Sequence, residues 1–529
     1  MIGQLPEECD IAIIGAGVGG LTAAALLSKA GYRVCVVDRE ARVGGYLAGF
    51  RRKEFTFDSA IHWLNQCGPG GIVHKVFSFL GADPPEAPGL ARIRRYKGES
   101  FDYLLTNNPD ELKARWIREF PEDAAGIERF FRSAKVLGAR MMGLSDFSRS
   151  RETFSLLDWI RTGVRMSTWG LPFLRYLGDK DCEQLSEFFT NPKLRSVFCS
   201  EENILSVLVP VGWAYVGDYQ RPPVGGSQVF PQWLMRLVRE RGSQVILRAG
   251  VESVLLEDNR AVGLRLEGGK ELRARWVIAA CDIEALFSKM LPEGAVPARR
   301  LADYREAELY SSCVTVSLGL NCEPQALGLG EELVFLTRDG IPRRAHNNGA
   351  PETAGLSILA PSLRDPTLAP PGKGTLTIYA SARLSYGDRW KTGENLERGE
   401  AYKAFKEAYA KVLLERVEDA IAPKLREHVE ILSVATPVTH LRYTGNRDGS
   451  IMGQLPSRKN MKLRVAGNRT PVDRLLIGGH WAQYGGGVPV AVRAAANAAL
   501  LVFKEEKSAA YAELCRVMDG RWRLMSSLQ

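Results

Sequence analysis

A glycine-rich loop between two apolar runs, near the start of the chain, limits the possible folds more than any other feature. It lies in the stretch DIAIIGAGVGGLTAAALLSKAGYRVCVVDRE, residues 10–40. Residues 11–14 and 34–37 predict strands buried on both faces, and residues 21–30 predict a helix between them. Strand, helix and strand in this order predict a parallel βαβ unit, and therefore an α/β fold with a Rossmann-like domain.

The loop carries the pattern G-x-G-x-x-G, which in this context indicates dinucleotide binding. The first glycine permits a tight turn, the second lets a pyrophosphate approach the backbone, and the third lets the helix pack closely on the strand. N–H groups at the start of the helix face the phosphates, and Asp38 lies where a carboxylate accepts hydrogen bonds from a ribose. The cofactor-binding residues predicted here are Gly15, Ala16, Gly17, Val18, Gly19, Gly20 and Asp38.

The residues that follow favour FAD over NAD as the dinucleotide. The stretch DREARVGGYLAGF, residues 38–50, resembles the R-x-G-G motif of the large flavoprotein group that contains amine oxidases, protoporphyrinogen oxidase and phytoene desaturases. The resemblance implies that the paired glycines contact the FAD pyrophosphate, and it adds Arg39, Arg42, Gly44 and Gly45 to the expected cofactor site. No second G-x-G-x-x-G follows a predicted strand, so no NAD(P) domain is expected. A quinone, oxygen or a transient reductant stays open as the electron acceptor or donor.

A middle segment is expected to return to the same domain. Residues 230–241 predict an amphipathic helix, residues 261–266 and 271–275 predict a hairpin, and residues 276–280 predict a separate buried strand. In the resembled flavoproteins, the residue that matches Val251 presents its backbone to the adenine.

The stretch GGHWAQYGGGVPVA, residues 478–491, predicts the other half of the cofactor site. It lies between a predicted strand at 475–477 and a predicted helix from 488 to about 504, whose dipole would stabilise negative charge on a reduced flavin. The cofactor contacts expected here are Gly479, His480, Gly486, Gly487, Val488 and Val490.

The predicted FAD-binding domain is therefore discontinuous in sequence. It comprises residues 1–75, 215–285 and 470–510. Residues 76–214, expected to be mostly helical, and residues 286–469 form a second, substrate-binding or lid domain with a mixed sheet and helices. Residues 511–529 form a C-terminal helix or tail.

The whole chain is similar to the phytoene desaturase, carotenoid isomerase and retinol saturase group of FAD proteins. Besides the glycine loops, the stretches FTFDSAIHWL, GGSQ and ATPVTHLRYTGNRDGSIMG carry this resemblance. It implies an FAD-dependent oxidoreductase that desaturates, saturates or isomerises the carbon–carbon double bonds of an apolar polyene or isoprenoid by hydride transfer at flavin N5. A long tunnel with aromatic and aliphatic walls is expected for such a substrate. Two features depart from the usual pattern: Ala60 stands where many relatives have glycine, and His62 with Trp63 favours the saturase branch.

Two histidines are the candidate catalytic residues. His62 follows the motif residue Asp58, and His480 lies in the C-terminal glycine turn. Each is either an acid–base or contact residue or a packed structural histidine. Asp58, His62, Trp63 and Tyr443 are the candidate substrate contacts, although Asp58 is expected to anchor its loop rather than react, and the stretch around Tyr443 is equally typical of a turn.

Two other functions are open as alternatives. A flavin amine oxidase acting on another substrate would share the fold, but the C-terminal glycine stretch has no cysteine that could join the flavin covalently. A non-catalytic prenyl-lipid-binding protein of the GDP-dissociation-inhibitor (GDI) type would have lost FAD binding, whereas all the motif glycines are present here.

The formal net charge of +9 would favour a negatively charged partner, such as nucleic acid or an anionic membrane. No nucleic-acid motif accompanies it, so nucleic acid is not expected as a partner, whereas an anionic membrane surface stays open. Residues 158–177, DWIRTGVRMSTWGLPFLRYL, combine aromatic residues with arginines, which is typical of an interfacial segment. A buried helix pair is the alternative interpretation of this segment.

The remaining patterns predict a cytoplasmic protein, either free or attached to a membrane surface. No run of 18 apolar residues predicts a membrane-spanning helix, and the N-terminal MIGQLPEECD does not resemble a targeting signal. The nine cysteines form no Cys-x-x-Cys pair, as expected of buried thiols in a reducing compartment. Neither cysteines nor histidines show metal-ligand spacing, so no metal is expected.

Overall fold

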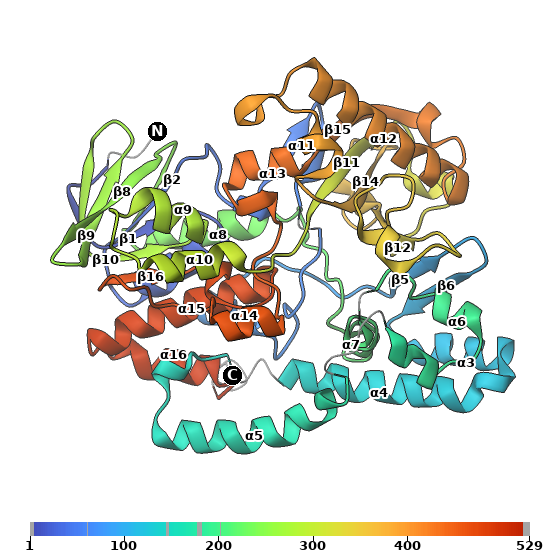
Figure 1. The fold of residues 1–529 in the computed structure, drawn as a ribbon, viewed down its shortest axis with the longest axis horizontal. Helices are drawn as coiled ribbons and strands as arrows, with labels where there is room; N and C mark the ends of the chain where they lie inside the picture. Colours follow the sequence, from blue (N-terminus) through green and yellow to red (C-terminus); the bar gives the residue numbers. More distant parts are fainter. Residues whose placement is uncertain (1–4, 61, 144–147, 177–181, 202, 522–529) are drawn as a thin grey trace.

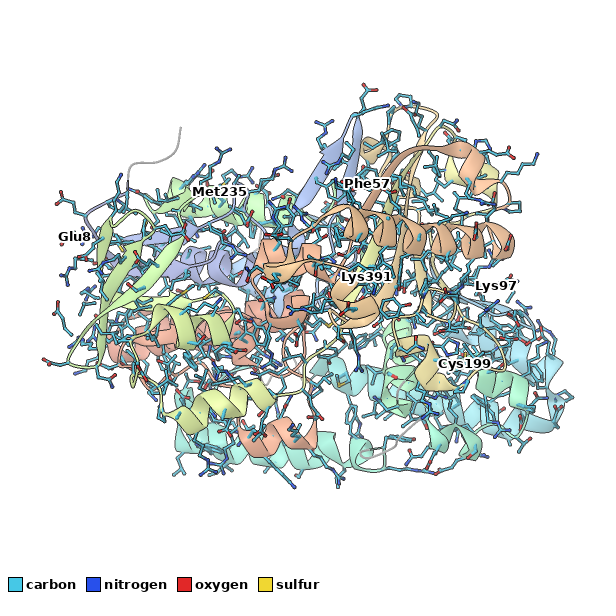
Figure 2. All side chains as sticks on the ribbon, turned by 45° about the horizontal axis from the view of Figure 1, so that its top comes forward. Glu8, Phe57, Lys97, Cys199, Met235 and Lys391 are labelled. Atoms are coloured by element: carbon cyan, nitrogen blue, oxygen red, sulfur yellow. The ribbon has the colours of Figure 1, made fainter. Side chains whose placement is uncertain are left out.

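The computed structural model describes the chain of 529 residues except residues 1–4, 61, 144–147, 177–181, 202 and 522–529. Two seven-stranded sheets lie toward opposite ends of the long axis (Figure 1). Glu8, at the start of the first strand of one sheet, and Lys97, at the end of a strand of the other, mark these two ends (Figure 2).

The first sheet has the parallel core of a nucleotide-binding fold. Its strands follow the order β7-β2-β1-β10, these neighbours are all parallel, and β16 is parallel to β10. Alternate residues of β1 pack into two different hydrophobic clusters, one on each face of the sheet. Both faces of the strand are therefore buried, which explains why its residues 11–14 are all apolar. The strands are β1 (Glu8–Ile14), β2 (Val34–Asp38), β7 (Gln244–Leu247), β8 (Val251–Glu257), β9 (Arg260–Leu266), β10 (Glu271–Ala279) and β16 (Leu475–Ile477). The helices on one face are α1 (Val18–Lys29), α2 (Ile72–Leu80), α8 (Val229–Glu240), α15 (Val488–Glu505) and α16 (Ala510–Met518).

Strand β10 corrects the sequence prediction of two strands at 271–275 and 276–280. It is one strand whose first residues pair antiparallel with β9 and whose last residues pair parallel with β16. Its burial changes along its length, from alternating exposed and buried residues at the start to four buried residues at the end. The change of partner and of burial within one strand therefore looked like a break in the sequence pattern.

The second sheet is mixed, with the order β15-β11-β14-β13-β12-β5-β6 and a single parallel pair, β12 with β5. Its first two strands in the sequence come from residues 76–214, which therefore do more than form helices. Helix α12 packs on this sheet. The elements are β5 (Arg92–Lys97), β6 (Asp102–Thr106), β11 (Ser312–Leu320), β12 (Leu333–Leu336), β13 (Leu356–Leu359), β14 (Gly374–Ala382), β15 (Val429–Ala435) and α12 (Glu400–Ala420).

A helical layer lies below the second sheet in Figure 1 and shares an aromatic-rich core with strands β5 and β6. Helices α4 and α7 cross with their backbones in contact at Gly138 and Gly212, where a Cβ atom on either residue would collide with the other helix. Residues 158–177 do not form a buried helix pair: residues 158–174 fall in the single helix α5, residues 175 and 176 follow it, and residue 177 lies outside the described residues. The helices are α3 (Pro109–Glu119), α4 (Ala124–Gly143), α5 (Leu156–Leu174), α6 (Pro192–Ser196) and α7 (Ile204–Tyr215).

Shorter elements connect these layers. The hairpin of β3 (Gly49–Arg52) and β4 (Phe55–Asp58) follows the R-x-G-G turn. The others are α9 (Ile283–Ala285), α10 (Ala298–Glu306), α11 (Tyr386–Trp390), α13 (Pro437–Thr444) and α14 (Arg458–Leu463). None of the helices in the described part of the chain combines the length and apolarity needed to span a bilayer.

Candidate functional site

The first glycine loop and the R-x-G-G turn lie side by side at the carboxyl end of β1. Gly17 is the N-cap of α1 and forms a parallel bridge with Gly44, and the Gly44 amide donates to the Ala16 carbonyl at 2.8 Å. A Cβ atom built on Gly17 meets no other atom within 4 Å. The two loops therefore leave open space directly in front of Gly17.

The C-terminal glycine stretch lies against the same point. A Cβ atom built on Gly19 would be 2.9 Å from the Gly478 carbonyl oxygen and 3.7 Å from the Ala491 carbonyl oxygen. The turn after β16 and the first turn of α15 thus contact the first turn of α1. The N-cap residues of the two helices, Gly17 and Gly487, provide no side-chain cap, and neither helix has an acidic residue in its first turn. Their first N–H groups are available to an anionic group.

Asp38 ties the first loop to the end of β2. Its Oδ2 accepts a hydrogen bond from the Ala16 amide at 2.6 Å, and its Oδ1 accepts one from the Glu40 amide at 2.8 Å. Burial raises the pKa of this carboxyl, and the two amides oppose that shift. Its contact with a ribose stays a prediction, and the structure adds the role of holding the loop in shape.

The other residues predicted around this loop also hold backbone segments in place. Arg39 donates to the Arg442 carbonyl at 2.9 Å, and Arg42 donates to the Gly49 carbonyl at 3.1 Å. The chain leading to Val251 runs beside the end of β2, where the Ala249 amide donates to the Asp38 carbonyl at 2.8 Å.

These loops fit the FAD expected from the sequence. The open space in front of Gly17 suits a pyrophosphate, and the uncapped starts of α1 and α15 supply N–H donors for negatively charged groups. Asp38 and the chain before Val251 lie together at the end of β2, on the side expected for the ribose and adenine.

His480 lies in the turn between β16 and α15, enclosed by residues that are distant in the sequence. Its Nε2 is buried and has no hydrogen-bond partner among the described residues. A Cβ atom built on Gly453 would be 2.9 Å from the His480 Cδ2 atom, and the neighbouring Trp481 donates to the Asn446 side chain at 3.3 Å. Burial lowers the pKa of His480 to about 4, so its ring is neutral at physiological pH.

Asp58 and His62 lie in a second buried cluster, at the end of β4. Asp58 Oδ1 accepts hydrogen bonds from the Ser227 amide at 2.7 Å and the Ser227 hydroxyl at 2.8 Å, which gives the GGSQ stretch a structural role. Burial raises the pKa of Asp58. The Nδ1 of His62 is 4.0 Å from Asp58 Oδ2, too far for a hydrogen bond, and both ring nitrogens of His62 are buried with no hydrogen-bond partner in the described part of the chain.

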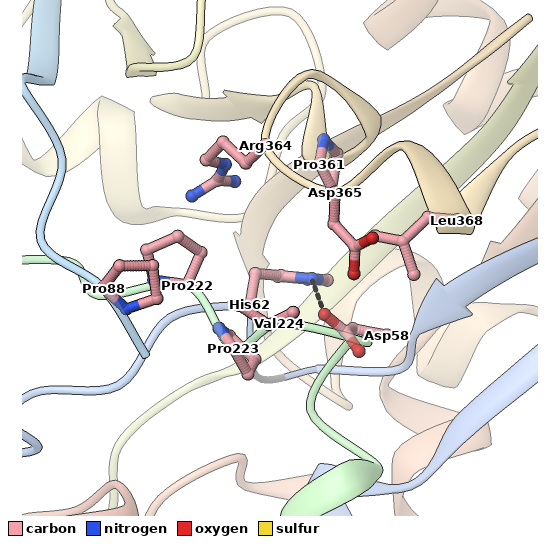
Figure 3. A pocket seen from close by; sticks show the side chains of 10 residues that line it. All are labelled: Asp58, His62, Pro88, Pro222, Pro223, Val224, Pro361, Arg364, Asp365 and Leu368. Carbon is pink, nitrogen blue, oxygen red and sulfur yellow. Dashed lines mark ion pairs between the residues drawn. The ribbon is translucent and has the colours of Figure 1, made fainter. Parts of the chain in front are cut away.

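The imidazole of His62 faces a small, mostly apolar cavity of about 30 Å³ (Figure 3). Burial, with a smaller effect of the Arg364 charge, lowers the pKa of His62 to about 3. Burial lowers the pKa of Arg364 to about 10, and Asp58 opposes that shift. Because the imidazole is neutral, its contact with Asp58 is not an ion pair. His62 can donate one hydrogen bond and accept another. The lining residues are Asp58, His62, Pro88, Pro222, Pro223, Val224, Pro361, Arg364, Asp365 and Leu368.

Tyr443 does not join this cluster. Its side chain is 55% exposed on α13. The next residue, Thr444, instead lies 3.3 Å from the hydroxyl of Tyr46, the residue that follows the paired glycines. Trp63 is partly buried, with its ring 6.3 Å from that of His62.

Sequence reasoning missed a further buried histidine, which lies near Tyr46. His440, on α13, has its Nε2 atom 3.2 Å from Cys313 Sγ and its ring 6.0 Å from that of Tyr46. Burial lowers its pKa to about 4. The sequence signals were the quoted stretch that contains His440 and the position of Tyr46 next to Gly45.

We expect His62, His440 and His480, whose pKa values are lowered by burial, to make the protein less stable in acid. Their folded pKa values, about 3 for His62 and about 4 for His440 and His480, lie below the value of an unfolded histidine, so the unfolded chain binds more protons as pH falls below about 6.5. Each histidine then removes about 2 kcal/mol of stability at about pH 5.

A comparison of one variant with the unmodified protein isolates this effect. Denaturant unfolding at about pH 7.5 and about pH 5 gives the stability lost on acidification, and His440→Gln is expected to lose about 2 kcal/mol less than the unmodified protein. An equal loss in both proteins would show that His440 does not stay neutral in the folded state.

Comparisons with known proteins identify the family of this chain. Residues 18–502 match the family model for flavin containing amine oxidoreductases. An all-trans-retinol 13,14-reductase of Danio rerio is 26% identical over 90% of this chain and 83% of its own. A Danio rerio protein named as an inactive all-trans-retinol 13,14-reductase is 24% identical with the same coverage. The chloroplastic prolycopene isomerase 2 of an Oncidium hybrid cultivar is 25% identical over 85% of this chain and 76% of its own.

Solved structures show the same fold. Cyclohexylamine oxidase from Brevibacterium oxydans has a TM-score of 0.59 at 16% identity, over 95% of this chain and 100% of its own. At this identity the likeness concerns the fold alone. The family model, in contrast, matches residues 18–502, which is most of the sequence. The chain therefore belongs to the family of flavin containing amine oxidoreductases and is an FAD-dependent oxidoreductase.

Proposed function

We propose that this oxidoreductase acts on the carbon–carbon double bonds of an apolar polyene or isoprenoid, by saturation, desaturation or cis–trans isomerisation. The observation that carries the proposal is that the two candidate histidines, His62 and His480, are buried and neutral, so neither presents a charge with which an ionic substrate would pair. The cavity beside His62, at about 30 Å³, has room for a water-sized molecule only. The relatives named for retinol and prolycopene, both polyenes, add support.

FAD, when bound, supplies hydride exchange at N5 of its ring. The residues of this chain then have three tasks. The glycine loops and the starts of α1 and α15 hold the dinucleotide, through Gly15, Ala16, Gly17, Val18, Gly19, Gly20, Gly44 and Gly45 at one end and Gly479, Gly486, Gly487, Val488 and Val490 at the other.

The second task is to orient an apolar substrate by shape, and the third is to exclude water. In this proposal His62 and His480 act as neutral hydrogen-bonding side chains, because burial disfavours their charged forms. Neither histidine holds a proton to donate as an imidazolium at neutral pH. A polyene dissolves in lipid rather than in water, so the proposal includes a membrane surface as the source of the substrate.

Mass spectrometry tests the reaction directly. The FAD-loaded protein is incubated anaerobically with retinoids and carotenoids, with the flavin either oxidised or reduced beforehand. A product two mass units heavier indicates saturation, one two units lighter indicates desaturation, and one of equal mass with a new retention time indicates isomerisation. We expect one of these products, and none from protein without FAD.

Amines provide the contrasting substrates. Putrescine and cyclohexylamine are added to the oxidised protein, and the flavin absorbance is followed without oxygen. Bleaching by an amine, together with no conversion of any polyene, would overturn the proposal.

A further inference from the structure

Helix α5 carries a bare apolar surface that the function described so far does not use. It runs along one edge of the molecule (Figure 1). Seven of the thirteen large apolar side chains that are exposed in the described part of the chain belong to this helix, with exposed fractions from 46% to 77%. They are Leu156, Leu157, Trp159, Ile160, Val164, Met166 and Leu171. Isolated apolar side chains are normal on a surface, whereas a contiguous group marks an interaction site.

The exposed side chains form a stripe along the helix. Leu156, Ile160, Val164 and Leu171 follow one another at intervals of four, four and seven residues, which places them on one face of an α-helix. Leu157 widens the stripe. The 19 residues of α5 span about 28 Å, so the stripe is long and narrow.

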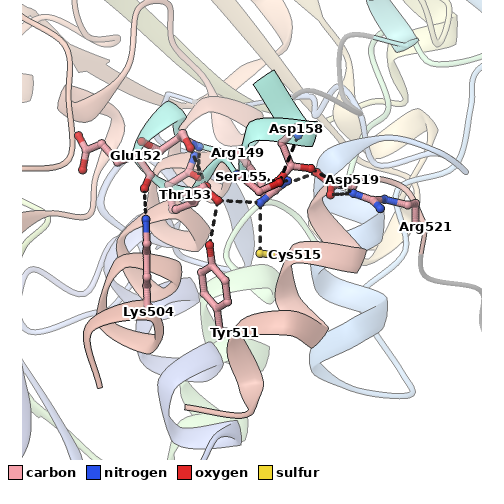
Figure 4. A network of polar contacts seen from close by, with 12 residues as sticks. Arg149, Glu152, Thr153, Ser155, Asp158, Lys504, Tyr511, Cys515, Asp519 and Arg521 are labelled. Carbon is pink, nitrogen blue, oxygen red and sulfur yellow. Dashed lines mark hydrogen bonds and ion pairs between the residues drawn. The ribbon is translucent and has the colours of Figure 1, made fainter. Parts of the chain in front are cut away.

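A polar network holds the start of α5 in a fixed position (Figure 4). Arg149 binds Asp158, in the first turn, at 2.8 Å and Asp519, at the end of α16, at 2.7 Å. This arginine helps to hold the pKa of Asp158 at about 2. Ser155 and Asp158 form a capping box. The start of the helix is therefore anchored to the end of α16, and its exposed stripe is held in a fixed position.

Positive charge lies next to the stripe. A groove of about 500 Å³ separates the start of α5 from α15 and α16. Among its lining residues are Arg161 and Arg516, which are exposed and form no ion pair with the described residues, and Lys504, which is exposed and donates to the Glu152 carbonyl. Asp158, the single acidic residue of α5, is already paired with Arg149. An apolar stripe beside unpaired cations matches a lipid surface with anionic headgroups.

We propose that α5 and the adjoining basic groove bind the surface of an anionic lipid bilayer. The helix lies in the plane of the interface with its stripe among the outermost acyl chains, and the cations of the groove contact headgroup phosphates. This inference deepens the proposed function, on which its role in substrate supply rests, because a polyene would enter the enzyme from the bilayer to which α5 is bound.

Vesicle flotation of the FAD-loaded protein tests the binding without any substrate. The vesicles consist of phosphatidylcholine, either alone or with about 30 mol% phosphatidylglycerol. We expect the protein to float with the anionic vesicles. The combined variant Leu156→Gln, Ile160→Gln and Val164→Gln is expected to bind about 30-fold more weakly or worse. The pair Arg161→Gln and Arg516→Gln is expected to lower binding to the anionic vesicles to the level seen with phosphatidylcholine alone.

A matched control replaces three exposed apolar residues elsewhere. Val216→Gln, Leu432→Gln and Met461→Gln, at exposed fractions of 41% to 52%, should bind vesicles like the unmodified protein. All variants should keep their flavin absorbance and thermal midpoint. Equal vesicle binding by the stripe variant and the unmodified protein would overturn the proposal, as would an unmodified protein that binds neither vesicle. If the unmodified protein instead forms a dimer that the stripe variant abolishes, a second copy occupies this face. Flotation needs no turnover, so the proposed reaction can fail while this binding holds.

Discussion

Gly17→Val is expected to give a folded protein that no longer retains FAD. The backbone of Gly17 has φ −72° and ψ 175°, which a valine adopts without strain, and a Cβ atom there meets no protein atom within 4 Å. The valine would instead fill the space in front of the loop where a pyrophosphate must approach the backbone. We expect FAD affinity to fall about 100-fold or more, with the thermal midpoint of the apoprotein unchanged.

Gly399→Val is the matched control. Gly399 is the N-cap of α12, has φ −74° and ψ −168°, and likewise has no atom within 4 Å of a built Cβ. The same substitution at the same helix position should leave FAD binding intact. Flavin absorbance after gel filtration and titration of the apoprotein with FAD give the measurement. Equal FAD affinity in both variants would show that the cofactor lies elsewhere.

Asp58→Ala is expected to cost about 2–5 kcal/mol of unfolding free energy, because it leaves buried donors without their acceptor. The Ser227 amide and the Ser227 hydroxyl would both lose the carboxylate oxygen to which they donate. Ser227→Ala removes one donor and leaves the carboxylate in place, so we expect a loss of about 1 kcal/mol.

The control for Asp58 is an aspartate at the surface. Asp473 is 61% exposed and lies 3.7 Å from Arg260, so Asp473→Ala should change stability by less than about 0.5 kcal/mol. Urea unfolding of the three variants gives the comparison. If Asp58→Ala were as mild as Asp473→Ala, the cluster around His62 would not depend on this carboxylate.

The first sheet was predictable because its signals are local. The apolar runs of β1, β2 and β16, and the glycines that end them, lie within a few residues of one another, and the structure confirms these strands. Strand β10 was not predictable as one strand, since its two halves differ in burial and in partner. Apolar periodicity indicates which faces of a strand are buried. A change in burial within one strand therefore resembles the end of that strand.

The buried clusters could not be predicted, because they form through contacts between residues that are distant in the sequence. His62 was a candidate from its motif, but Arg364 reaches the same cavity from a segment about 300 residues later in the chain. The pattern of α5 was equally compatible with burial, because apolar periodicity does not say which surface, if any, covers a helix. Tyr443 shows the converse case, as an aromatic residue in a motif that lies at the surface.

The position of β16 has a consequence for how the protein is made. This strand completes the sheet beside β10, and the turn that follows it contacts the first turn of α1. During translation, the cofactor site therefore cannot form around the first glycine loop until almost the whole chain has emerged. The nascent chain must keep β1, β2 and their apolar faces from aggregating through that interval, and FAD can act as a late ligand that draws the finished sheet into its native state.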